Sequence, residues 1–282
     1  MDGLNRRQTL QGIAAGFAGL SLLSGCLSSE NGTNEADPTE ATTRSTSQGN
    51  QTTVSTQRVE VGEHVPIATG KQLWLEEIRS QPQILLKSET GEKQVAGGGI
   101  DTFFLFEFRT ESDISFSELV EHLQVAGSQE NLQLLEQPVV SNQEFETVGV
   151  KVADNSQVQD VRIDWRESGG VRYRWEVSGS KLEDLLAVPR FDDVELKFPL
   201  SVEKNSQVSF DVQVSNNGPS GDFIAILEIL PGEERRVVEF EVNSDTYAMY
   251  TGFVTVAGES AETGTARLDW GAKTIEREFK IG

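Results

Sequence analysis

The sequence predicts a mainly β protein in which two antiparallel β-sandwich domains follow a disordered tether. Apolar and polar residues alternate with a period of two in many short runs after residue 58, and turn-forming residues separate these runs. This pattern is typical of strands with one buried face. Residues 27 to about 57 hold almost no large apolar side chain, so they cannot bury enough surface to offset the entropy of ordering. We therefore expect a tether over residues 26–57 and sandwiches over residues 58–188 and 189–282.

A β-hairpin is the clearest local pattern of the first domain. Two alternating runs flank a glycine-containing turn at residues 167–170, which is typical of a hairpin with one buried face. Its inward side chains are expected to be Val161, Ile163, Trp165, Val171, Tyr173, Trp175 and Val177. Further strands are expected over residues 73–79, 84–87, 103–108 and 146–152. The run 103–108 is rich enough in Phe to be buried on both faces at its start and on one face at its end.

Two short helices are expected to interrupt these strands. Ser115 with Glu118, and Ser180 with Glu183, form the Ser-x-x-Glu pattern of a capping box. In a capping box the two side chains bind backbone N–H groups at the helix start. Pro189 cannot continue the second helix, so we place the domain boundary at residues 189–193.

The second domain repeats the alternating pattern and adds a family resemblance. Residues 208–214 alternate, and Asn216 opens a turn after them. Other strands are expected over residues 223–230, 236–243, 247–256, 265–270 and 274–281. The stretch from Val208 to Gly221 resembles the second-strand region of CARDB-like immunoglobulin domains, which occur on archaeal and bacterial cell-surface proteins. The stretch from Phe145 to Trp165 resembles telokin-like immunoglobulin domains of prokaryotic lipoproteins. These resemblances imply immunoglobulin-like sandwiches, and neither family implies a catalytic residue.

The first 26 residues have the pattern of an export signal that ends in a lipid-attachment site. Arg6 and Arg7 precede an apolar run over residues 12–23, which is shorter than the roughly 20 residues of a membrane-spanning helix. The arginine pair resembles a twin-arginine export signal of the haloarchaeal kind. The sequence Leu-Ser-Gly-Cys that ends at Cys26 resembles a lipobox. These resemblances imply removal of residues 1–25, a lipid on Cys26 and a position on the extracellular side of the cell membrane.

The tether has two further features. Cys26 is the only cysteine, so no intramolecular disulfide can form and the domains depend on their cores alone. Asn31 and Asn50 each begin an Asn-x-Thr sequon, so both are candidate glycosylation sites.

The chain is strongly acidic, and its acids are dispersed. It holds 45 Asp and Glu against 24 Lys and Arg, a net charge of −21. Such a surface stays hydrated when salt screens its self-repulsion, and it resembles the acidity of proteins from salt-loving archaea. A cation-binding surface is the alternative interpretation. Nucleic acid is excluded as a partner because phosphate binding needs a basic patch.

Four arginines lie on the polar face of the predicted hairpin and form a local cluster of positive charge in this acidic chain. Because like charges on neighbouring strands repel, they need acidic neighbours or an anionic partner. The simpler interpretation is pairing with acids such as Asp164 and Glu176. The functional interpretation is a docking site for a sulfated or uronic-acid glycan, or for an acidic partner protein. The four residues are Arg162, Arg166, Arg172 and Arg174.

No pattern of catalytic, cofactor-binding or metal-binding residues stands out, so we expect no enzyme, no cofactor and no metal. The chain has only two histidines, His64 and His122, and no His-x-x-x-His spacing. It also lacks a Gly-x-Ser-x-Gly turn and a phosphate-binding loop. Asp192, Asp193 and Glu195 leave open a calcium site at the domain boundary.

These observations together predict a lipid-anchored extracellular protein that acts as a non-enzymatic surface module. Such a module would bind or space an envelope protein, a glycan or another envelope component. A solute-capturing lipoprotein of a transporter is the alternative, and a surface hydrolase is a third possibility. A flat surface favours the interaction module, whereas a cleft between the domains favours capture or catalysis.

Overall fold

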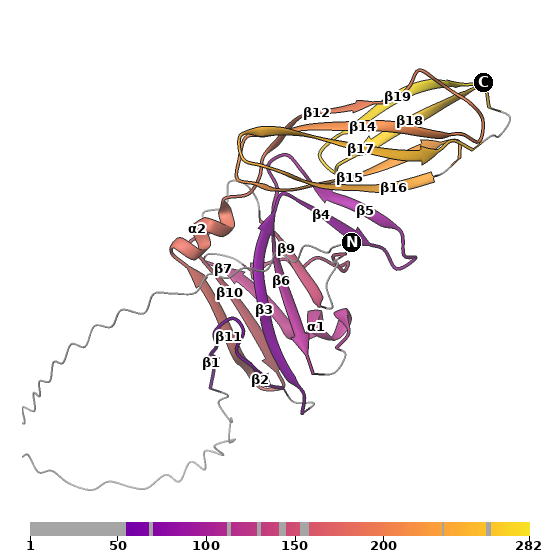
Figure 1. Ribbon diagram of the computed structural model, residues 1–282. Helices are drawn as coiled ribbons and strands as arrows, with labels where there is room; N and C mark the ends of the chain where they lie inside the picture. The colour runs from indigo at the N-terminus through magenta and orange to yellow at the C-terminus, as the bar shows by residue number, and fades with distance from the viewer. Residues whose placement is uncertain are drawn as a thin grey trace, which may run out of the picture. The chain divides into compact units, whose positions relative to one another are not determined.

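A computed structural model describes residues 55–282, apart from 68–69, 112–113, 129–130, 141–144, 153–157, 233 and 258–260. This part of the chain consists of β-strands and two short helices, which confirms the predicted fold class (Figure 1). The elements of the first sandwich are β1 (Gln57–Arg58), β2 (Val65–Pro66), β3 (Gln72–Gln81), β4 (Gln83–Lys87), β5 (Lys93–Gly97), β6 (Thr102–Thr110), α1 (Phe116–His122), β7 (Leu123–Gly127), β8 (Asn131–Leu132), β9 (Glu146–Val152), β10 (Asp160–Glu167), β11 (Gly170–Ser178) and α2 (Ser180–Leu186).

The first sandwich packs a four-stranded sheet, in the order β2-β3-β6-β9, against a five-stranded sheet, in the order β1-β11-β10-β7-β8. Apolar residues from the facing sides of both sheets form one core. In that core Phe108 of β6 meets Trp175 of β11 edge to face, with ring centroids 6.0 Å apart. Gln57 already belongs to β1, which pairs in parallel with β11, so this last residue of the predicted tether is part of the first sandwich.

The predicted hairpin is present as β10 and β11. The two strands pair in antiparallel register, with Ile163 opposite Trp175 and Asp164 opposite Arg174. The register shifts between Trp165 and Arg166. The predicted inward side chains are buried, except for Val171, which is half-buried.

The strand β6 differs from the prediction at its end. Phe104, Phe106 and Phe108 face the main core. On the opposite face, Phe103 and Leu105 pack into a smaller cluster with Ile84 of the β4–β5 hairpin. Glu107 lies on the same face as these two and is also buried, because Arg79 of β3 covers it with a salt bridge of 2.7 Å. The prediction that only one face is buried at the end of this strand was therefore wrong.

The two helices form where expected, but only α1 has a side-chain cap, and this is the Ser115 half of the predicted capping box. The Ser115 side chain accepts a hydrogen bond from the Glu118 N–H, so it is the N-cap of α1. In α2 the N-cap is Gly179, with φ of +62°, and no side chain caps it. Ser180 is already the first helical residue, so its predicted capping role was wrong. The left-handed conformation of Gly179 starts the helix one residue earlier than the pattern indicated.

The second sandwich packs a three-stranded sheet, in the order β12-β14-β17, against a five-stranded sheet, in the order β13-β19-β18-β15-β16. Its core is separate from that of the first sandwich and includes Phe210, Val212 and Val214 of β14, as the alternation predicted. Arg277, which lies between Ile275 and Phe279 in the alternation of the last strand, is exposed and donates to the Leu196 carbonyl. The elements are β12 (Phe191–Lys197), β13 (Ser201–Val202), β14 (Gln207–Asn216), β15 (Gly221–Leu230), β16 (Glu234–Val242), β17 (Thr246–Thr255), β18 (Thr263–Asp269) and β19 (Thr274–Ile281).

Candidate functional site

The predicted export and lipidation residues lie outside the described residues. They are Arg6, Arg7 and Cys26, together with the sequon residues Asn31 and Asn50. Within the described ranges, no helix is both long enough and apolar enough to cross a bilayer.

The structure brings the four predicted arginines to one hairpin and gives most of them acidic partners. Arg174 makes a bidentate contact with Asp164, with Nε–Oδ1 of 2.6 Å and Nη2–Oδ2 of 2.9 Å. Asp164 is 6% exposed, so the pair neutralises a nearly buried carboxylate. The hydrogen bond that Arg174 donates to Asp164 raises the pKa of the Arg174 guanidinium above its ordinary value.

Arg172 and Arg162 are also engaged. Arg172 donates to the Tyr173 hydroxyl at 3.1 Å and to Glu167 at 2.8 Å. The bond with Tyr173, followed by the attraction of Glu167, raises the pKa of Arg172. The Arg162 Nε lies 3.3 Å from an Asp160 oxygen, and its Nη2 donates to the Gly127 carbonyl.

Arg166 is the exception among the four. Its side chain is exposed and makes no salt bridge with a described residue. Three of the four arginines are thus held by intramolecular acids, which is the simpler of the two interpretations. The Arg162 and Arg172 side chains remain 36% and 46% exposed in spite of their acidic partners.

The two histidines make structural contacts. His64 stacks on Trp74 with ring centroids 4.1 Å apart. His122 stacks on Trp165 at 4.9 Å, and its Nδ1 lies 2.8 Å from the Arg166 carbonyl oxygen. Each ring is therefore already occupied on one face by an indole.

The described residues contain no group of three or more His, Cys, Asp or Glu side chains arranged to hold a metal ion. At the boundary where calcium was left open, Asp192 accepts a hydrogen bond from Asn217 at 3.0 Å. Glu195 pairs with Lys197 at 3.8 Å. Asp192 and Glu195 therefore have protein partners of their own.

The sequence did not indicate how the two sandwiches meet. The β4–β5 hairpin of the first sandwich contacts β15 of the second (Figure 1). Leu85 packs with Ile224 and Ile226 in a small buried cluster. Gln83, which is also fully buried, joins the two sandwiches by hydrogen bonds. Its Nε2 donates to the Trp270 carbonyl at 2.8 Å, and its Oε1 accepts from the Ile224 N–H at 3.1 Å.

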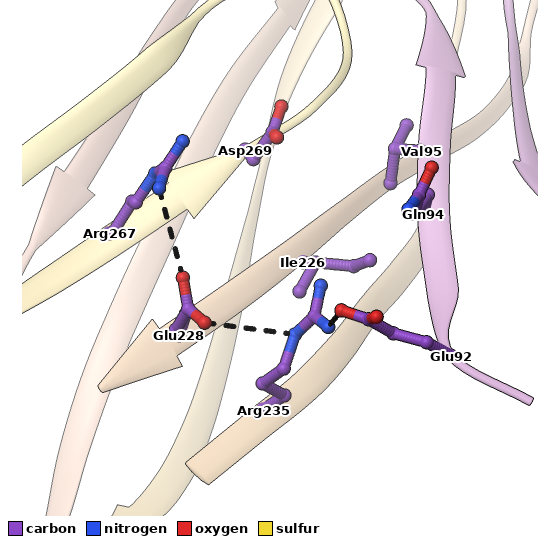
Figure 2. A pocket seen from close by; sticks show the side chains of 8 residues that line it. All are labelled: Glu92, Gln94, Val95, Ile226, Glu228, Arg235, Arg267 and Asp269. Atoms are coloured by element: carbon purple, nitrogen blue, oxygen red, sulfur yellow. Dashed lines mark hydrogen bonds and ion pairs between the residues drawn. The ribbon is translucent and has the colours of Figure 1, made fainter. Parts of the chain in front are cut away.

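A polar groove of about 360 Å³ runs along one side of this junction. Figure 2 shows that its charges form a chain in which Glu228 lies between Arg267 and Arg235, and Arg235 also pairs with Glu92 of the hairpin. The Asp269 side chain accepts from the Gly271 N–H at 2.9 Å. Glu92, Glu228, Arg235 and Arg267 therefore each have a partner of opposite charge within the groove.

A second groove of about 590 Å³ lies on the junction between β3, the hairpin and strands β15 to β17. Its acids and its Lys93 make no salt bridge with one another among the described residues. Arg79 lines the groove and holds the buried Glu107, whose Oε2 has no described partner. The lining residues are Glu77, Arg79, Gln81, Leu85, Lys93, Val140, Asp222, Ile224, Val237, Glu239 and Tyr250.

The known proteins to which this chain is similar are all distant from it. No protein-family model matches it, and no curated protein matches its sequence. A β-glucosidase from Listeria innocua is similar over 33% of this chain and 16% of its own, with 8% identity and a TM-score of 0.29. The CARDB domain of a Pyrococcus furiosus protein, solved with two metal ions, is similar over 33% of this chain and 89% of its own, with 18% identity and a TM-score of 0.25. A tandem of titin domains covers 74% of this chain and 97% of its own, with 6% identity and a TM-score of 0.18. Such distant similarities carry no argument about function, and the chain spans about a sixth of the glucosidase.

Proposed function

We propose that this protein is a lipid-anchored extracellular module whose two sandwiches bind or space an envelope component without catalysis. The observation that carries the proposal is the junction between the sandwiches. Gln83 and the apolar cluster around Leu85 tie the two together, so the described part can present its surfaces as one unit. A buried, hydrogen-bonded junction of this kind holds the two domains in a fixed arrangement, which suits a spacer or presenting module better than two domains that move independently.

The export and anchoring part of the proposal rests on the signal pattern of residues 1–26. It is tested by fractionation of cells that express the full chain, combined with protease treatment of intact cells. We expect the wild type in the membrane fraction and open to external protease. Cys26→Ser should release it into the medium, and Arg6→Lys with Arg7→Lys should keep it inside. Retention of residues 1–25 in the membrane-bound protein, detected by mass spectrometry, contradicts the proposal.

The binding part is tested by affinity capture. The full chain is incubated with solubilised envelope at high salt, and captured material is identified with bovine serum albumin as the bait control. We expect one envelope protein or polysaccharide to be enriched over the control. Equal recovery of envelope material on both baits contradicts a binding role, and a spacer role is then the remaining proposal.

Capture of a solute for a transporter remains a second candidate because of the groove of about 590 Å³ between the sandwiches. Its volume suits a small polar solute, since ligand pockets commonly span about 300–1,000 Å³. Native mass spectrometry of protein purified from cells tests it. A bound small molecule that is lost on Lys93→Ala favours capture, whereas a bare chain in both cases argues against it.

A further inference from the structure

The outward face of strands β14 and β17 differs from the rest of this acidic surface. Its ten positions carry a single formal charge, on Asp211. By contrast, Glu276, Arg277, Glu278 and Lys280 are all exposed on β19. We call these ten positions the charge-poor face. They are Gln207, Ser209, Asp211, Gln213, Ser215, Tyr247, Met249, Thr251, Phe253 and Thr255.

Three large apolar side chains stand out on this face. Tyr247 is 70% exposed, Met249 57% and Phe253 49%. Tyr247 and Phe253 are six residues apart on β17, so their rings lie roughly 20 Å apart along the strand. Exposed aromatic and Met side chains are typical of binding surfaces. Charged side chains border the face on both sides, from Asp192, Glu195 and Lys197 of β12 next to β14 and from Glu234 and Arg236 of β16 next to β17.

The neutral polar side chains of this face carry amide or hydroxyl groups, which can form hydrogen bonds. They are Gln207, Ser209, Gln213, Ser215, Thr251 and Thr255. The Thr251 hydroxyl donates to Asp211 at 2.7 Å, and the Gln213 oxygen accepts from Lys197 at 3.2 Å. Both Asp211 and Gln213 keep further donor or acceptor capacity toward solvent. The outward side chains of β17 are, in order, Tyr247, Met249, Thr251, Phe253 and Thr255, and the amide and hydroxyl side chains of β14 lie beside them.

A second copy of the chain fits this face poorly. Two ten-residue strands about 4.8 Å apart present on the order of 300 Å², whereas stable interfaces bury about 800 Å² on each partner. Addition of a partner strand is hindered too, because side chains of β16 occupy part of the free edge of β17. Arg236 donates to the Phe253 carbonyl, and the Thr255 N–H donates to Glu234 at 2.7 Å. A net charge of −21 further opposes self-contact and contact with an acidic partner.

We propose that the charge-poor face binds a neutral, extended polysaccharide of the cell envelope. The aromatic rings would stack on the apolar C–H faces of sugar rings, while the amide and hydroxyl side chains exchange hydrogen bonds with sugar hydroxyls. This ligand needs no charge on the protein, spans the 20 Å line of the face and requires only a small contact area. The inference rests on the proposed function, because it names the ligand class and the surface of that binding module.

The test uses the full chain and the neutral fraction of envelope polysaccharide from the cells that make it, collected as the unbound fraction on an anion exchanger. Binding is measured by affinity electrophoresis at high salt. We expect the wild type to be retarded and the double variant Tyr247→Ser, Phe253→Ser to bind about tenfold more weakly, because it loses both ring contacts. Leu200→Ser is the matched control, since Leu200 is 83% exposed elsewhere in the second sandwich, and its binding should be unchanged.

Three results overturn the proposal. These are equal binding by the double variant, binding to the acidic fraction alone, and dimerisation in sedimentation that the double variant abolishes without any retardation by polysaccharide. Urea unfolding of each variant establishes that the fold is retained. Localisation is measured separately, by fractionation. If the protein is anchored outside the cell but does not bind the neutral fraction, this inference is refuted and the proposal of an anchored module is not.

Discussion

At the scale of single residues, buried polar groups fix the positions of their neighbours, which the alternation of apolar residues does not specify. Asp164 and Asn216 are both almost fully buried, and each is satisfied by named partners. A buried polar group without a partner is costly, so these residues accept only one arrangement of their neighbours. Their substitution should therefore cost more than that of exposed residues of the same type.

Removal of Arg174 should strongly destabilise the first sandwich. Arg174→Met leaves the buried Asp164 without its cation, and we expect the free energy of unfolding to fall by about 2–4 kcal/mol. Arg166→Met is the control, because Arg166 is exposed without a described salt bridge, and it should stay within about 0.5 kcal/mol of the wild type. Urea unfolding followed by Trp fluorescence measures both. Equal effects of the two substitutions would show that the pair of Arg174 and Asp164 adds nothing to the free energy of unfolding.

The same pair has a defined dependence on pH. Asp164 raises the pKa of Arg174, so the stabilisation is fully present below the ordinary arginine pKa and is lost only as the pH rises through the raised value. Between about pH 6 and 9 the difference in unfolding free energy between the wild type and Arg174→Met should therefore stay constant. A steady loss of that difference within this range contradicts the assignment.

Asn216 should be equally sensitive. Its Oδ1 accepts from the Arg190 and Gly218 N–H groups, and its Nδ2 donates to the Pro219 and Val242 carbonyls. Asn216→Asp turns this donor into a carboxylate oxygen that faces carbonyl oxygens, so we expect a loss of about 2–4 kcal/mol. Asn243→Asp, at an exposed position, is the control. Unfolding midpoints in urea that agree between the two variants would contradict this role.

At the scale of elements, the β4–β5 hairpin has two functions in the fold. It covers one face of β6, and it carries the contact with the second sandwich. The turn after β5 approaches that sandwich closely. Gly98 has φ of +82°, and a Cβ there would lie 2.9 Å from the Trp270 carbonyl oxygen. Glycine is needed here for both its conformation and its size.

Loss of the Gln83 bridge should loosen the junction. Gln83→Ala leaves the Ile224 N–H and the Trp270 carbonyl without partners, which should cost about 2–3 kcal/mol. Hydrogen exchange followed by mass spectrometry should show faster exchange in β15, where Ile224 lies. Gln94→Ala on the neighbouring strand β5 is the control and should leave exchange unchanged. Unaltered exchange in Gln83→Ala would mean that the junction does not depend on this side chain.

At the scale of the whole molecule, the dispersed negative charge sets the response to salt. The net charge of −21 repels itself within the compact state, and the Debye length falls from about 10 Å at 0.1 M to about 3 Å at 1 M salt. We expect the free energy of unfolding to rise by at least about 1 kcal/mol over this range, the scale of one charge pair in water. Thermal unfolding in NaCl measures this. A flat or falling midpoint would contradict the expectation.

The charge-poor face shows why part of the surface could not be predicted. In β14 the apolar residues all point one way, so the sequence revealed the buried face. In β17 Tyr247, Met249 and Phe253 alternate with Ala248, Tyr250 and Val254, so both faces are apolar and alternation alone cannot tell which is inward. The sequence showed only that both faces of β17 are apolar. The pairing of β17 with β14 was needed to tell that Tyr247, Met249 and Phe253 point outward.

The sequence by itself determined the fold class, the position of most strands and the inward residues of the hairpin, because a period of two in hydrophobicity is a local property of a strand. It also supplied the acidic balance and the export pattern of the first 26 residues. Only the tertiary structure decided that Glu167 holds Arg172 and that Glu176 pairs with Arg58, outside the four arginines. It also decided that Gln83 joins the sandwiches and that Glu107 is buried. These contacts join residues far apart in the chain or on different strands, and their energies depend on distances that no local pattern contains.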